Sequence, residues 1–134
     1  MSVRSLYIAQ DRISRLKKKI KTENKYFKMK VVYNKLVRDK IPEIIEASGK
    51  TCETEILSDK QYLQMLDKKL DEELAEYHKD QNIEELADLL EVLYATAKAR
   101  GYSIEELEQV RVEKQKARGG FDMKILLESV QNKE

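Results

Sequence analysis

Residues 71–90 read DEELAEYHKDQNIEELADLL, and this stretch places eight carboxylates within twenty positions. Glu73 and Glu76 are three residues apart, and Glu85 and Asp88 repeat that spacing after a short polar link. Residues three apart lie one turn apart on the same face of a helix, so each half of the stretch can present a pair of carboxylates. The pattern raises the question whether these four acids are solvated or are directed at one point in space.

Capping signals divide this part of the chain into three predicted helices. Three polar residues are each followed three positions later by Gln or Glu, as in a capping box: Ser58, Asn82 and Ser103. The first helix is expected to run to about Lys79 and the second to end near Gly101. The third is expected to break at ARGGF, residues 117–121, where two glycines follow one another.

The segments on either side of these helices carry weaker signals. RDKIPEIIEASGK, residues 38–50, predicts a short helix, because Pro42 is tolerated in a first turn and Gly49 suits a helix end. The alternation in TCETEIL, residues 51–57, predicts a short extended segment. The C-terminal tail is expected to add one more short helix around residues 125–130. The fold class that follows is all-α.

The short polar link predicts that the first two of these three helices lie antiparallel, as a helical hairpin. Glu76 and Glu85 are equidistant from the centre of the link, and so are Glu73 and Asp88. In the second helix, Glu85 and Asp88 fall within an apolar sector that widens through Leu89. Carboxylates in such a sector need partners, because burying an unpaired charge is costly. A hard divalent cation such as Mg²⁺, which takes oxygen ligands, is the partner that four carboxylates favour.

Other kinds of site find little support in the sequence. The single histidine, His78, does not follow a Glu by three positions, as the Glu-x-x-His motifs of a di-iron bundle require. The chain has no Cys/His zinc cluster and no Gly-rich phosphate loop ending in Lys-Ser/Thr. The single cysteine, Cys52, excludes an intramolecular disulfide. Since no apolar run is long enough for a bilayer or a secretory signal, the expected location is the cytoplasm, without a membrane partner.

The first 28 residues differ in charge from the rest of the chain. Residues 1–28 carry a net charge of +7, from nine Lys/Arg and two Asp/Glu. Residues 29–134 carry a net charge of −6, from 17 Lys/Arg and 23 Asp/Glu. Four apolar residues recur at helical spacing among lysines: Ala9, Ile13, Leu16 and Ile20. We therefore expect a basic amphipathic extension over residues 1–28, which packs its stripe on a core domain spanning 29–134. Its few lysines give only a weak electrostatic signal for binding of nucleic acid or an anionic membrane.

EELAE and EELAD, residues 72–76 and 84–88, together resemble the E-x-x-E…E-x-x-D motif of the all-α nucleoside triphosphate pyrophosphohydrolases, the MazG-like group. YNKLVRDKIPEII (33–45) and KARGGF (116–121) resemble the branch that is phosphoribosyl-ATP pyrophosphohydrolase-like. The similarity covers about residues 32–129. It implies an antiparallel helical bundle whose core is completed by oligomerisation, as a homodimer or higher homo-oligomer. It also implies Mg²⁺-dependent hydrolysis between the α and β phosphates of a nucleotide, giving a monophosphate and pyrophosphate.

The resemblance also implies roles for individual residues. The metal ligands would be Glu73, Glu76, Glu85 and Asp88, with Mn²⁺ able to replace Mg²⁺. Glu72 would hold a second metal or orient the attacking water as the catalytic residue. A polyphosphate further needs cations from the protein. The candidates for substrate binding are Lys35, Arg38, Lys40, Lys114 and Arg118.

Two alternatives stay open. Within the enzyme class, the motifs do not separate a house-cleaning enzyme for ordinary or damaged nucleotides from the hydrolysis of phosphoribosyl-ATP in histidine biosynthesis. Outside that class, a helical interaction module could bind an acidic partner or nucleic acid through its basic N-terminal helix, with the acids merely solvated. Binding of Mg²⁺ through the four carboxylates distinguishes the enzyme from the module.

Overall fold

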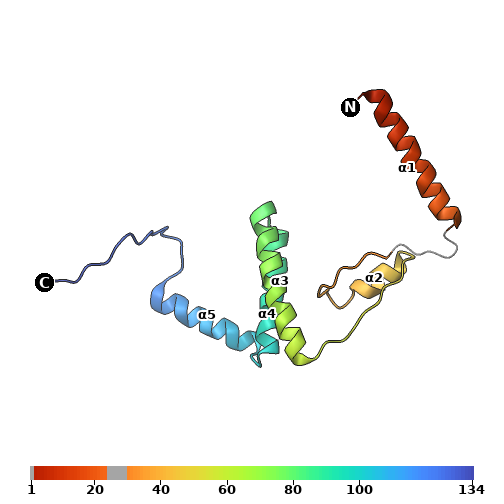
Figure 1. The fold of residues 1–134 in the computed structure, drawn as a ribbon. Coiled ribbons are helices and arrows are strands. Elements are labelled where there is room, and N and C mark those ends of the chain that lie inside the picture. The colour runs from red at the N-terminus through yellow and green to blue at the C-terminus, as the bar shows by residue number, and fades with distance from the viewer. Residues whose placement is uncertain (1, 24–29) are drawn as a thin grey trace. The chain divides into compact units, whose positions relative to one another are not determined.

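The computed structural model describes residues 2–23 and 30–134, and all regular secondary structure in these ranges is helical. The helices are α1 (Val3–Glu23), α2 (Ile41–Ala47), α3 (Asp59–Asp80), α4 (Ile83–Ala99) and α5 (Ile104–Arg118) (Figure 1). The all-α prediction is therefore confirmed. A search of the described helices finds none that is both long enough and apolar enough to cross a membrane.

The chain divides into two compact units, Met1–Asn34 and Lys35–Glu134. The predicted boundary between Lys28 and Met29 lies outside the described residues. In the first unit, α1 is the helix predicted from the apolar spacing, and Arg15 pairs with Asp11 one turn earlier at 2.7 Å. The apolar side chains of Ile13 and Leu16 are both exposed, so this unit does not bury its stripe by itself.

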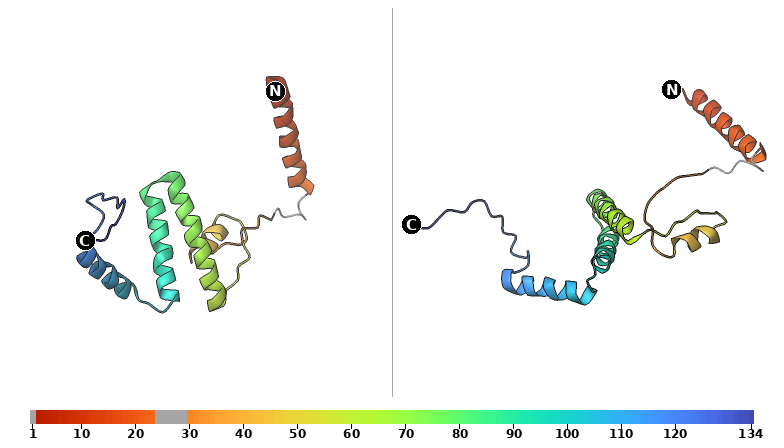
Figure 2. Two further views of the ribbon diagram at one scale, coloured as in Figure 1. Left: turned by 60° about the vertical axis from the view of Figure 1, so that its left-hand side comes forward. Right: turned by 60° about the horizontal axis from the view of Figure 1, so that its bottom comes forward.

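In the second unit, α3 and α4 form the antiparallel hairpin that the sequence predicts (Figures 1 and 2). Gln81 ends α3 in the left-handed conformation, at φ 51°, and its N–H donates to the carbonyl of Tyr77 at 2.7 Å. The next residue, Asn82, begins α4 by accepting a hydrogen bond from the N–H of Glu85 at 2.9 Å. A two-residue link therefore reverses the chain and sets the two helices side by side.

The predicted helix boundaries mostly agree with the structure. Complete capping boxes precede α3 at Ser58 and α5 at Ser103, and α5 ends at Arg118 with Gly119 as its C-cap, as expected. The predicted helix around residues 125–130 is wrong, because residues 124–134 have no regular structure and their side chains are exposed. A helix of about six residues is unstable unless it packs on something. The expected extended segment at residues 51–57 pairs with no other segment of the described chain and forms no strand.

One chain buries very little apolar surface. Among the described residues only Leu66 of α3 is a buried hydrophobic residue, at 3% exposed. Three leucines on one stripe of α4 are between 43% and 47% exposed: Leu86, Leu90 and Leu93. The sector of α4 that contains the acids is the better covered one, since Asp88, Leu89 and Val92 are all half-buried. The acids and the leucine stripe therefore occupy different sides of the hairpin.

Removing the cap of α3 tests how much of the hairpin depends on its start. Ser58→Ala should lower the free energy of unfolding by about 1 kcal/mol, because the N–H of Gln61 loses the acceptor that it has at 3.3 Å. Chemical denaturation measures the loss. Ser58→Asp should restore most of the stability, since a carboxylate accepts the same bond and suits a helix N-terminus. An equal loss in both variants would contradict a capping role.

Candidate functional site

The acids of the hairpin converge in two adjoining groups. One carboxylate oxygen from each of Glu73, Glu85 and Asp88 lies within 4.8 Å of the others, and all three residues are partly buried. Glu76, Asp80 and Glu85 form a second group with the same limit, in which Glu76 and Asp80 are exposed. The structure therefore brings all four predicted acids together around Glu85. It also adds Asp80, which the sequence analysis missed although it lies one turn after Glu76.

The way α4 begins explains why Glu85 can take part in both groups. At Ser58 and Ser103 the capping box is complete, with the acceptor side chain of the third residue turned back to the cap. At Asn82 the structure shows the first half of the box, the bond from the N–H of Glu85 to the Asn82 side chain. The carboxylate of Glu85 is directed at the acids of α3 instead.

The electrostatics of Glu85 show that the cluster holds excess negative charge. Burial raises the pKa of Glu85, and so do four neighbouring carboxylates. In order of decreasing effect these are Asp88, Asp80, Glu76 and Glu73. Ionisation of Glu85 therefore costs more in the folded protein than in water, and a nearby cation would lower that cost.

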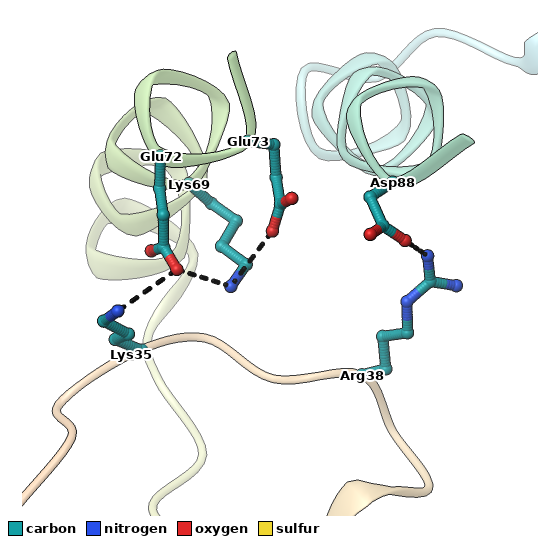
Figure 3. Close-up of polar contacts among 6 residues, drawn as sticks. All are labelled: Lys35, Arg38, Lys69, Glu72, Glu73 and Asp88. Carbon is teal, nitrogen blue, oxygen red and sulfur yellow. Dashed lines mark hydrogen bonds and ion pairs between the residues drawn. The ribbon is translucent and has the colours of Figure 1, made fainter. Parts of the chain in front are cut away.

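Two cations from the segment that precedes α2 contact the acids of the hairpin (Figure 3). Arg38 pairs with Asp88, with 2.6 Å between Nη2 and Oδ1, and Lys35 pairs with Glu72, with 3.2 Å between Nζ and Oε1. A turn that leads into α2 holds this segment, because the N–H of Ile41 donates to the carbonyl of Arg38 at 3.0 Å. Two of the predicted phosphate-binding residues therefore lie at the acidic cluster.

A third cation, Lys69 of α3, lies between the two adjacent glutamates Glu72 and Glu73 (Figure 3). Its Nζ is 3.4 Å from Oε1 of each. Burial tends to raise the pKa of Glu72, but hydrogen bonds and charge from Lys35 and Lys69 outweigh it, so the pKa is lowered overall. The sequence analysis did not single out Lys69. Its position three residues before Glu72 and four before Glu73 is a spacing that allows ion pairs on one helix.

The other predicted cations lie elsewhere in the second unit. Lys114 and Arg118 are in the last two turns of α5, which contacts α4 but makes no contact with α3 in the described chain. Neither of them forms an ion pair with the acids among the described residues. Lys40 is the exposed residue that precedes α2. The structure therefore brings Lys35 and Arg38 to the acids, and it does not bring Lys40, Lys114 or Arg118 there.

A small groove adjoins the cluster within the same unit. Its volume is about 370 Å³, and it is lined by Asp39, Tyr62, Glu91, Ala95, Lys98 and Ala99. Asp39 follows Arg38 in the chain, and Glu91 lies one turn after Asp88 on α4. The groove and the acids are therefore neighbours along the same helix.

Neutralising Glu85 should stabilise the protein when divalent cations are absent. Since folding raises the pKa of Glu85, its charged form destabilises the fold at pH values above that raised pKa. Glu85→Gln should raise the melting temperature at neutral pH with a chelator present. The gain should disappear as the pH falls through the raised pKa, where the wild-type carboxyl becomes protonated as well. A gain that is independent of pH would show that the ionisation of Glu85 is not its cause.

Comparisons with known proteins add a partial relative. No family model matches the chain, and no solved structure matches it. A protein of Mycolicibacterium smegmatis, described as uncharacterized, is 61% identical to it over 41 residues. This match covers 31% of the present chain and 42% of the relative, so the chain spans less than half the length of the relative that it matches. The match shows a shared segment and assigns no activity to it.

Proposed function

We propose that the protein is a divalent-cation-dependent nucleotide pyrophosphohydrolase. The main support is the convergence of Glu73, Glu85 and Asp88, whose carboxylate oxygens lie within 4.8 Å of one another. Oxygen donors of this kind are the ligands that Mg²⁺ prefers. The raised pKa of Glu85 reflects burial and repulsion from neighbouring carboxylates, and a bound cation would reduce that repulsion. The donor set therefore fits Mg²⁺, and Mn²⁺ in its place.

The residues of the site divide into three roles in this proposal. Glu73, Glu85 and Asp88 would hold the cation, with Glu76 beside them. When bound, Mg²⁺ would supply neutralisation of the polyphosphate charge and polarisation of the scissile phosphate. Glu72 lies outside both carboxylate groups, and its pKa is lowered, so it stays ionised and can orient a water molecule by accepting a hydrogen bond from it.

The segment before α2 would bind the phosphates of the substrate. Lys35 and the guanidinium of Arg38 suit phosphate oxygens, and both side chains are more than half exposed. We place the base or sugar in the groove that Tyr62 and Ala95 line. Ala95 is seven residues beyond Asp88, which is about 10 Å along a helix at 1.5 Å per residue. A nucleotide is long enough to reach from the acids to this groove.

We further propose that the active form is a homodimer or a higher homo-oligomer. The exposed leucines of α4 and the single buried hydrophobic residue of the described chain support this assembly. An apolar face of this kind is uncommon on a monomer and indicates an interface. The second subunit would complete the core of the helical bundle.

A substrate panel tests the proposed activity. The full chain should be incubated with Mg²⁺ and ordinary nucleoside triphosphates, damaged ones and phosphoribosyl-ATP, with chelator controls, and the products separated by ion exchange. The expected products are a monophosphate and pyrophosphate. Preference for phosphoribosyl-ATP would assign the histidine-pathway reaction. A diphosphate with orthophosphate, or no Mg²⁺-dependent product from any substrate, would contradict the proposal and favour an interaction module.

A further inference from the structure

We infer that Lys69 is a positioning residue of this site, which fixes the place of Glu72 relative to the cation-binding carboxylates and competes with the cation for Glu73. The inference rests on the proposed function. It starts from one observation: a single ammonium group, on a side chain that is 21% exposed, lies 3.4 Å from both Glu72 and Glu73. Figure 3 shows the Lys69 side chain ending at a point between the two carboxylates.

The geometry separates the two adjacent glutamates into different environments. Successive residues of a helix point about 100° apart, so Glu72 and Glu73 cannot both face α4. Glu73 joins Glu85 and Asp88, whereas Glu72 belongs to neither carboxylate group and contacts two ammonium groups instead. Lys69 is the residue that contacts both glutamates. It thereby fixes the place of Glu72 relative to the carboxylates that would hold the cation.

Two opposite effects follow from this position. The ammonium group repels a divalent cation that approaches Glu73, so Lys69 should weaken cation binding. The same group holds the Glu72 carboxylate in one orientation, so Lys69 should speed turnover. A residue that only supported the helix would not produce these two effects together, since loss of structure weakens binding and turnover alike.

Substitution of Lys69 separates these effects. Lys69→Met removes the charge and keeps a long apolar side chain. We expect it to bind Mg²⁺ or Mn²⁺ several-fold more tightly by titration calorimetry without nucleotide. We expect kcat to fall by about 10- to 100-fold, the usual cost of losing a group that orients a site residue. Lys69→Arg keeps the charge and should retain the cation affinity and most of kcat.

Lys68→Met is the matched control. Lys68 is the preceding residue of α3, is exposed, and makes no ion pair among the described residues, so the same substitution there should change neither quantity. Circular dichroism should show equal helix content in all variants. Unchanged or weaker cation binding in Lys69→Met, an unchanged kcat, or loss of both properties in Lys69→Arg would overturn the inference. Absence of cation binding by the wild type would overturn the proposed function, and the inference with it.

Discussion

Glu73→Gln should keep the fold and lose about 100-fold or more of the metal-dependent hydrolysis. The side chain of Glu73 is 13% exposed, the least of the acids whose side chains form ion pairs here, and it belongs to the partly buried carboxylate group. An amide is a poorer ligand than a carboxylate for a hard cation. A bound cation supplies several kcal/mol to the transition state, and each 1.4 kcal/mol lost lowers the rate tenfold.

The fold should survive this substitution because glutamine keeps the shape of glutamate. Glu73 is one of the carboxylates that raise the pKa of Glu85, so its neutralisation removes one like charge from the cluster. The substitution removes the ion pair between Lys69 Nζ and Glu73 Oε1, which are 3.4 Å apart. Lys69 keeps its ion pair with Glu72. Equal helix content and an equal or higher melting temperature are expected without divalent cations.

The measurement is the initial rate of pyrophosphate release with saturating Mg²⁺, beside calorimetric cation binding. Glu84→Gln is the matched control, because Glu84 lies in the same acidic stretch, is exposed and belongs to neither carboxylate group. It should retain the wild-type rate. Full activity of Glu73→Gln with a chelator present would show that the carboxylate cluster does not carry the reaction.

The sequence predicted the hairpin and the meeting of its acids because both depend on local signals. Ser58 and Asn82 mark helix starts through their own hydrogen bonds, and a two-residue link leaves the chain only an antiparallel return. Glu73 and Asp88 are the same number of residues from the centre of the link, so they lie side by side on the two antiparallel helices. The convergence of the carboxylates to within 4.8 Å follows from that register.

Features that depend on distant residues could not be predicted in the same way. Arg38 and Asp88 are 50 positions apart, and neither residue alone signals their 2.6 Å ion pair. Periodicity likewise identifies the leucine stripe of α4 without showing whether anything covers it. The predicted helix near residues 125–130 failed for this reason, since its apolar side chains have no packing partner in the described chain.

Leu90→Lys should break the assembly and lower the melting temperature. Leu90 is 45% exposed in the middle of the leucine stripe, between Leu86 and Leu93, and a lysine there would place a charge in the proposed interface. The wild type is expected to scatter light as a dimer or larger species at micromolar concentration, and the variant as a monomer. Loss of activity should accompany dissociation if the second subunit completes the core.

Glu91→Lys provides the comparison for this experiment. The substitution introduces the same side chain at the next position of α4, about 100° around the helix from the stripe, where the residue is already charged and exposed. It should keep the oligomeric state. A wild type that is monomeric and unfolds cooperatively would contradict the assembly, as would identical behaviour of the two lysine variants.

The position of the stripe explains why assembly and chemistry should depend on each other. On one side of the hairpin the acids repel, as the raised pKa of Glu85 shows, and Leu66 is the only hydrophobic residue buried among those described. Apolar burial is worth about 25 cal/mol per Å² removed from water, so covering the leucine stripe of α4 would add to the stability of this unit. A partner on that stripe would hold α3 and α4 together against the repulsion. The carboxylates would then stay in place before a cation arrives, and Leu90→Lys should weaken cation binding although Leu90 belongs to the leucine stripe and not to the sector of α4 that contains the acids.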